Sequence, residues 1–194
     1  VTIDPNGGLE IIADTMFRNL PITSIAIPDS VKVIGEEAFS GCTALEDVTL
    51  PQSITEIGSS MFYRCENLKE IELPASITVV DEETFYKCES LDSVTFLGEI
   101  TSIGEGAFEF CEELGAVTIP NSCTSIGADA FACCYSLSSV TLPQGLTKLG
   151  DGAFSYCESL TSIVIPASLK VIEGRTFSNC KLLKTVTIPE GVEK

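Results

Sequence analysis

Cysteine is the residue in this sequence with the widest chemical scope, because a thiol can form a disulfide, bind a metal ion or act as a nucleophile. Seven of the nine cysteines recur at intervals of 23 residues: Cys42, Cys65, Cys88, Cys111, Cys134, Cys157 and Cys180. Disulfides within this series would leave one thiol over, and zinc is disfavoured because the chain has no Cys-x-x-Cys pair and no histidine. We therefore predict that these cysteines are reduced and pack in the core as small apolar side chains.

Two cysteines fall outside this series. Cys123 stands where other units carry Ile54 and Ile77, which predicts another core position. Cys133 lies next to Cys134, and its side chain must project in a different direction. We expect Cys133 to be the one exposed and reactive thiol.

Carboxylates are the second group of candidates, and they occur in short runs. Glu36 and Glu37 form one run, Asp81, Glu82 and Glu83 a second, and Glu112 and Glu113 a third. The first two runs lie where a helical turn is expected to start, and acidic side chains there interact favourably with free backbone N–H groups. The alternative for the second run is a calcium site, but the sequence has no Asp-x-Asp-x-Asp-Gly loop.

Catalysis has few residues to draw on. Histidine, the commonest general base, is absent, and no serine or cysteine outside the repeat stands beside an activating partner. The glycines form no phosphate-binding motif. We predict that the protein is not an enzyme, with no catalytic residue, no metal site and no cofactor.

The charge balance narrows the range of partners. The chain has 11 Lys and Arg against 28 Asp and Glu, a net charge of −17, so it should repel nucleic acids and anionic membranes. No apolar run approaches the roughly 20 residues of a transmembrane helix. Residues 1–5 do not resemble a signal peptide, but this carries little weight because the chain begins and ends inside a repeat.

One internal repeat organises all of these residues. Phenylalanine recurs every 23 residues, three positions before each periodic cysteine, at Phe39, Phe62, Phe85, Phe108, Phe131, Phe154 and Phe177. Proline keeps the same phase, with Leu97 in place of one proline. Each unit reads approximately L-x-x-V-x-I-P-x-S-I-x-x-I-G-x-x-A-F-x-x-C-x-x.

The unit predicts a sequence of local structures. Alternating aliphatic and polar residues, as in 45–50, indicate a strand, and the following proline starts a turn. A second extended piece, such as 53–57, leads to a glycine that permits a bend, except at Asp81 and Glu173. The spacing of phenylalanine and cysteine at i and i+3 suits one face of a helical turn.

A single unit cannot bury its own apolar face, so successive units must stack. We predict an α/β repeat solenoid, a curved stack of 23-residue units with a parallel β-sheet on one face and short helical turns on the other. Residues 1–194 would form a single domain, with 1–20 as a degraded N-terminal repeat and 21–194 as regular repeats, the last one incomplete. In the degraded unit, Met16 and Phe17 mimic Met61 and Phe62. The seven periodic phenylalanines should lie in one buried column.

The outer face of the sheet is the candidate binding surface. Strand residues on either side of Val48 and its equivalents should point away from the core. They are rich in Thr and Ser, and acidic residues gather on the second to fourth strands. We predict that partners bind at Glu46, Asp47, Thr49, Glu70, Glu72, Asp92 and Thr95. The alternative is that the threonine rows are ordinary solvated strand surface.

The pattern Leu-x-x-Val-x-Ile-Pro followed by Ile-Gly-x-x-Ala-Phe-x-x-Cys resembles the BspA-like, or Treponema pallidum-type, class of leucine-rich repeats over essentially the whole chain. The resemblance implies a secreted or cell-surface protein, commonly bacterial or from a mucosal protozoan, in a group where some members bind host matrix proteins such as fibronectin or fibrinogen. The group has no binding motif that can be transferred residue by residue.

Our leading hypothesis is therefore a non-enzymatic protein-interaction module that adheres to a protein partner, such as a host extracellular-matrix protein, through the outer face of the sheet. The alternative is a structural spacer that has no ligand of its own.

Overall fold

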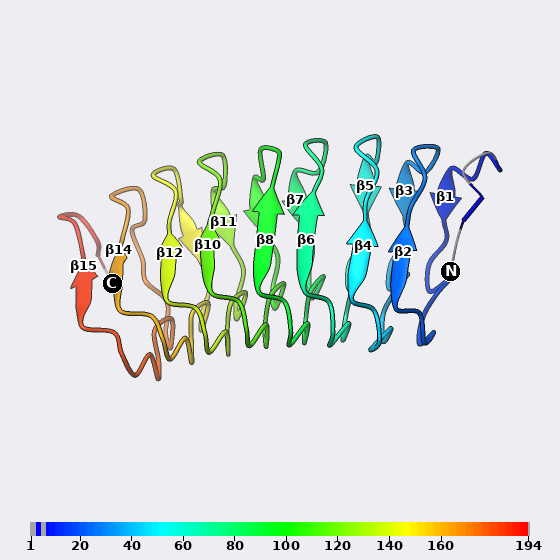
Figure 1. Ribbon diagram of the computed structural model, residues 1–194. Helices are drawn as coiled ribbons and strands as arrows, with labels where there is room; N and C mark the ends of the chain where they lie inside the picture. Colours follow the sequence, from blue (N-terminus) through cyan, green and yellow to red (C-terminus); the bar gives the residue numbers. More distant parts are fainter. Residues whose placement is uncertain (1–2, 5–6, 194) are drawn as a thin grey trace.

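The computed structural model describes residues 3–4 and 7–193, which form a row of stacked coils, each lying beside the next coil in the sequence (Figure 1). We number the coils 1 to 8 by the phenylalanine that each contains: Phe17, Phe39, Phe62, Phe85, Phe108, Phe131, Phe154 and Phe177. A regular coil has three sides, which are a strand of the main sheet, a second short strand and a turn segment.

The main sheet confirms the predicted parallel strands. Its members are β2 (Ser24–Ala26), β4 (Asp47–Thr49), β6 (Glu70–Leu73), β8 (Ser93–Phe96), β10 (Ala116–Thr118), β12 (Ser139–Thr141), β14 (Ser162–Val164) and β15 (Thr185–Thr187). The register is one repeat, so Glu70 lies beside Ser93. Hydrogen-bonded ladders join the strands in pairs, β2 with β4, β6 with β8, β10 with β12 and β14 with β15. Along β6, exposed glutamates alternate with buried Ile71 and Leu73.

The second side of the coils is a column of two-residue strands. They are β1 (Ile11–Ile12), β3 (Val33–Ile34), β5 (Glu56–Ile57), β7 (Val79–Val80), β9 (Ser102–Ile103), β11 (Ser125–Ile126) and β13 (Lys148–Leu149). They form one parallel sheet in the order β1-β3-β5 and another in the order β7-β9-β11-β13. The column is therefore interrupted between β5 and β7.

The glycine after the second strand is required because adjacent coils touch there. A Cβ placed on Gly104 would lie 2.6 Å from the backbone nitrogen of Glu82 in the preceding coil, too close for any real side chain. Asp81 carries a Cβ at this position in coil 4, and the column is broken at that coil. Glu173 is the other exception, and in the described chain no second strand follows β13. In coils 2 to 8, each departure from glycine thus coincides with a break in the column.

The third side is a turn segment, and the predicted short helical turn is wrong. Residues 3–4 and 7–193 contain no helix. Every coil has two residues with positive φ, four positions apart, such as Glu83 (φ 52°) and Lys87 (φ 55°) in coil 4. An α-helix needs negative φ at each residue, so these two residues exclude it. A tight turn also places phenylalanine and cysteine on the same face, which is why their spacing suggested a helix.

Backbone N–H groups of the turn segments donate to the next coil. In coil 2, the N–H groups of Glu37 and Phe39 donate to the carbonyl oxygens of Ser59 and Met61, each at 3.0 Å. The same pattern joins each coil to the next from coil 1 to coil 8. We call this side the turn column. Of the three sides, it is the one that continues without interruption through the described residues.

The phenylalanine rings stack behind the turn column. Adjacent ring centroids from Phe17 to Phe177 are 5.1 to 6.0 Å apart, with interplanar angles of 4° to 20°. The rings from Phe39 to Phe154 are fully buried, which confirms the predicted column. Phe177 is only half-buried, since in the described chain no further turn segment covers its outer side.

Coil 1 keeps the turn of a regular coil but not all of its core. Phe17 stacks on Phe39, and β1 pairs with β3. Met16 does not mimic the buried Met61, because it is 51% exposed. No coil precedes coil 1 in the described chain to cover this position.

We predict that Phe108→Ala lowers the free energy of unfolding by about 3 to 5 kcal/mol, because the cavity is shared with two neighbouring coils. Phe108 lies 5.1 Å from both Phe85 and Phe131 and also meets Phe96 edge to face. Phe177→Ala is the matched control, since its ring has one stacking neighbour and is half-buried. Denaturant unfolding of both variants provides the measurement. Equal losses for the two would contradict the shared cavity.

We also predict that Asp81→Gly closes the break between β5 and β7, whereas Asp81→Ala does not. The alanine variant removes the carboxylate but keeps the Cβ that prevents close contact. In the glycine variant, the amide of position 81 should donate to the preceding coil, as the amides of Gly58 and Gly104 do. Its hydrogen exchange should therefore slow on the order of tenfold, the effect of one net backbone hydrogen bond. The same exchange rate in both variants would show that the Cβ is not the cause.

Candidate functional site

The outer face of the main sheet, the sheet face, consists of the first and third positions of its eight strands. All of these side chains are exposed, as predicted: Ser24, Ala26, Asp47, Thr49, Glu70, Glu72, Ser93, Thr95, Ala116, Thr118, Ser139, Thr141, Ser162, Val164, Thr185 and Thr187. Most are small hydroxyl residues, and none is aromatic. The face therefore offers hydrogen-bonding groups at regular spacing but few large side chains.

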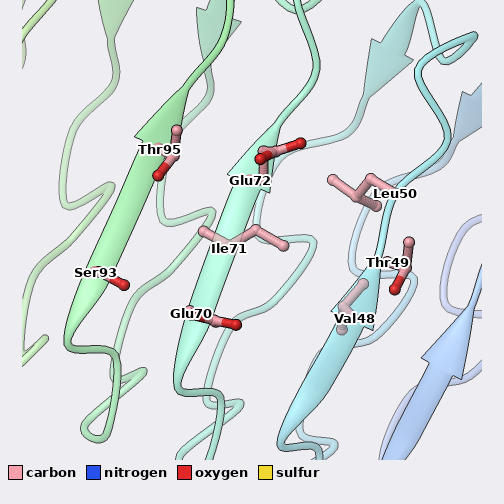
Figure 2. Close-up of a pocket in the computed structure, with 8 residues that line it drawn as sticks. All are labelled: Val48, Thr49, Leu50, Glu70, Ile71, Glu72, Ser93 and Thr95. Carbon is pink, nitrogen blue, oxygen red and sulfur yellow. The ribbon is translucent and has the colours of Figure 1, made fainter.

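A groove of about 310 Å³ opens on the sheet face. Figure 2 shows Glu70 and Glu72 on β6, with β4 on one side and β8 on the other. Its lining is Val48, Thr49, Leu50, Glu70, Ile71, Glu72, Ser93 and Thr95. No ladder joins β4 to β6 at the boundary between coils 3 and 4, where the second strands β5 and β7 are also not paired with each other, and the groove extends from this boundary to Ser93 and Thr95 of β8.

Four of the seven predicted binding residues line this groove, namely Thr49, Glu70, Glu72 and Thr95. The other three lie close to it in the sequence but do not line it. Asp47 is exposed at the start of β4, and Asp92 is exposed just before β8. Glu46 is half-buried, and its carboxylate lies 2.5 Å from the Lys69 ammonium.

The groove combines an apolar floor with an acidic rim. Leu50 and Ile71 are 6% and 3% exposed, so they form the floor. Among the described residues, Asp47, Glu70 and Glu72 form no ion pair. A groove of this kind suits a partner that offers cationic groups and hydrogen-bond donors.

The periodic cysteines form a ladder of thiol hydrogen bonds. All nine cysteines are free. In coils 2 to 8, each Sγ donates to the carbonyl oxygen of the phenylalanine in the preceding coil, at 3.0 to 3.3 Å. Cysteine suits this position because it is small and apolar enough to be buried, yet it still has a donor for a core carbonyl group. Their predicted core packing is confirmed from Cys42 to Cys157.

The thiols are poorly suited to nucleophilic chemistry. Burial raises the pKa of Cys65, Cys111 and Cys157 well above the usual range, so little of the reactive thiolate is present. Cys133 is half-buried rather than fully exposed, and burial raises its pKa as well. It is not the one accessible thiol, because Cys180 is also half-buried.

The acidic runs at Glu36 and at Asp81 lie in bends and turns, so the interaction with a helix start that was expected for them does not exist. The Glu37 carboxylate instead pairs with Arg18 at 2.5 Å, and burial raises the pKa of Asp81. Among the described residues, no three His, Cys, Asp or Glu side chains come together to hold a metal ion. The calcium alternative at Asp81, Glu82 and Glu83 therefore has no geometric support.

The outer surface of the turn column, the turn edge, carries a group of aromatic residues that the repeat pattern did not reveal. They are Tyr63, Tyr86, Phe110, Tyr135 and Tyr156, which include all four tyrosines of the chain. Tyr63 stacks on Tyr86 at 4.8 Å, and Phe110 meets Tyr86 edge to face at 5.8 Å. The sequence could have indicated this group, because each member lies within four positions after a repeat phenylalanine. The exact position differs between coils, so the members do not form a periodic series.

Glu109 lies on the same edge, next to Phe110 in the sequence. Burial, followed by the nearby carboxylates of Asp129 and Glu83, raises the pKa of Glu109 to about 7. Lys87 has the opposite effect, because its positive charge favours the carboxylate. The carboxyl groups of Glu83, Glu109 and Asp129 at the centre of the turn edge thus outnumber Lys87.

We predict that a thiol reagent labels at most two cysteines of the native protein, the half-buried Cys133 and Cys180, and nearly all nine after denaturation. The physical reason is burial, which blocks access and suppresses the thiolate. Mass spectrometry of the labelled protein provides the measurement, and Cys133→Ser should remove one of the native labels. Detection of disulfides among the periodic cysteines would contradict the hydrogen-bonded ladder.

The chain matches a family model described as "BspA type Leucine rich repeat region (6 copies)" in two overlapping stretches, residues 10–126 and 85–194. Among solved structures, it is similar to a leucine-rich repeat protein from Bacteroides ovatus, with 36% identity and a TM-score of 0.82, over 87% of this chain and 46% of that chain. It is also similar to the leucine-rich repeat protein of T. pallidum, with 31% identity and a TM-score of 0.72, over 82% of this chain and 77% of that one.

The chain thus spans less than half the length of the B. ovatus protein. None of the curated proteins compared with the chain matches it significantly. The described residues contain no helix that could cross a membrane.

Repeat proteins of this kind use their extended surfaces to bind other proteins. Because the family model covers nearly the whole length and the stacked coils agree with it, the chain belongs to the BspA-type leucine-rich repeat family.

Proposed function

We propose that the protein is a non-enzymatic interaction module of a secreted or cell-surface protein and that it adheres to host or matrix proteins through the sheet face. The contact centres on the groove between β4, β6 and β8, with Glu46, Asp47 and Asp92 at its margin. The family resemblance supports the extracellular setting and a matrix protein such as fibronectin or fibrinogen as the partner.

The observation that carries this proposal is the coincidence of the acidic strands with the groove. Glu70 and Glu72 line a concave surface with an apolar floor, and neither has a cation of its own in the described chain. The parallel strands present these side chains from a rigid element. A basic partner would be attracted by the carboxylates, but the shortage of large anchoring side chains keeps its affinity modest.

We predict that Glu70→Lys with Glu72→Lys weakens binding of fibronectin or fibrinogen at least about tenfold. The two glutamates attract a basic surface of the partner, whereas lysines in their place would repel it. The matched control is Glu36→Lys with Glu82→Lys, which makes the same change in net charge at exposed positions in the bends after the second strands β3 and β7. Surface plasmon resonance at two salt concentrations gives the affinity and its salt dependence, and thermal melting checks the fold.

If the control pair weakens binding while the sheet pair leaves affinity and salt dependence unchanged, the site lies on another face. If the unaltered protein binds neither matrix protein, the adhesive function is wrong and the spacer alternative takes its place.

A further inference from the structure

The turn edge has the large side chains that the sheet face lacks. All four tyrosines lie there together with Phe110, and Tyr156 is 44% exposed. Tyrosine is enriched among the residues that contribute most to protein binding, since it buries a large area with few rotatable bonds. These aromatic side chains lie on an outer edge of the coils and are not part of the hydrophobic core, so their presence there requires an explanation.

Backbone hydrogen bonds to the next coil hold Phe110 and Tyr156 of this aromatic row in place. Lys87, Phe110, Cys133 and Tyr156 occupy the same position of coils 4 to 7, and each N–H donates to the next coil at 2.7 to 2.9 Å. Their side chains therefore start from fixed points on successive coils. A partner would meet a preorganised surface, which reduces the entropy lost on binding.

Carboxylates surround the row. Glu66, Glu89, Glu112 and Glu158 share a second position two residues further along the coils. Arg64 pairs with Glu66 at 3.1 Å, and Lys181 pairs with Glu158 at 2.7 Å. In the described chain, Glu89, Glu109 and Glu112 have no ion-pair partner. The middle of the turn edge is therefore aromatic and negatively charged.

Lys87 shows how this surface holds a cation. Its Nζ lies 5.8 Å from the ring centroid of Tyr86 and 5.2 Å from that of Phe110, within the range of a cation–π interaction. Its charge also acts on Glu109 and Glu112. In coils 6 and 7, Tyr135 and Tyr156 present further rings at the same edge, and among the described residues no lysine or arginine makes a cation–π contact with either ring.

The ring arrangement favours a cationic partner over a neutral sugar. Sugars bind aromatic residues by lying on an open ring face, but Tyr63 and Tyr86 already cover each other at 4.8 Å. Phe110 meets Tyr86 at 78°, and Lys87 lies against both of these rings. In the described chain Tyr135 and Tyr156 have no ring stacked on them, so their faces stay open to a cation. The unpaired carboxylates beside them favour arginine and lysine side chains over a neutral sugar.

We propose that the turn edge of coils 4 to 7 is a second docking surface, separate from the sheet face, that binds an extended cationic segment of a protein partner. Arginine or lysine side chains of that segment contact Phe110, Tyr135 and Tyr156 and pair with Glu89, Glu109 and Glu112. This surface does not depend on the proposed function of the sheet face, and a single partner can engage one surface without the other.

A fluorescent hexa-arginine peptide tests the proposal, with binding followed by fluorescence anisotropy at about 0.15 M salt to screen long-range attraction. The first variant is Phe110→Asn with Tyr156→Asn, which removes two rings and no charge. Both positions have positive φ, 59° and 58°, which asparagine tolerates well, so the fold should be kept. We expect affinity for the peptide to fall about tenfold, because two cation–π contacts are lost.

Two matched controls separate a site from general charge attraction. Glu109→Gln with Glu112→Gln should also weaken binding about tenfold, whereas Glu36→Gln with Glu82→Gln, the same charge change at exposed positions outside both surfaces, should leave it unchanged. Val164→Asn removes an exposed apolar side chain from the sheet face and should have no effect. Thermal melting checks each variant.

Three results would overturn the proposal. The first is unchanged peptide binding by the aromatic variant, and the second is an equal effect of the two glutamine pairs. The third is binding of a neutral hexasaccharide, lost in the aromatic variant, with no binding of hexa-arginine, which would assign the surface to a glycan. Because the sheet-face experiment uses matrix proteins and other variants, either proposal can fail without the other.

Discussion

The fold depends on the close contact of consecutive coils along the turn column. Three interactions meet there, and each joins one coil to its neighbour: the backbone N–H groups donate to the next coil, the phenylalanine rings stack, and each periodic cysteine donates to a carbonyl of the preceding coil. No coil can make these contacts alone. Stability is therefore a property of neighbouring pairs, and the end coils, with exposed Met16 and half-buried Phe177, have fewer of them.

Close contact imposes a backbone geometry that ordinary residues tolerate poorly. Two positions in each coil have positive φ, and most carry a residue other than glycine, such as Lys87 or Tyr156. Each costs about 1 to 2 kcal/mol, which the inter-coil hydrogen bonds must offset. At the bend after the second strand the requirement is stricter, because any Cβ meets the backbone of the preceding coil. Asp81 breaks this rule, and the groove on the sheet face opens at the same coil boundary.

The repeat also divides the surface chemistry. Strand positions must alternate, so the sheet face can carry small β-branched and hydroxyl residues, with glutamates on β6. Positions just after the repeat phenylalanine leave the core at the turn edge, where longer side chains meet no neighbouring strand. Aromatic residues gather there, with Lys87 held against two rings. The same coil thus presents a hydroxyl-rich acidic face on one side and an aromatic acidic edge on another.

The sequence by itself determined the stacked 23-residue units, the parallel main strands, the phenylalanine column, the buried cysteines and the exposed rows of the sheet face, because each depends on the spacing of apolar residues along one unit. It did not reveal the turn segments, since the spacing of Phe39 and Cys42 is the same in a helix and in a tight turn. Only the contact between coils decides between a helix and a tight turn. In that contact, N–H groups that a helix would use for its own hydrogen bonds donate to carbonyl oxygens of the next coil. The groove and the aromatic row likewise arise between coils, since β4, β6 and β8 together line the groove and stacking brings Tyr86 and Phe110, 24 residues apart, into contact.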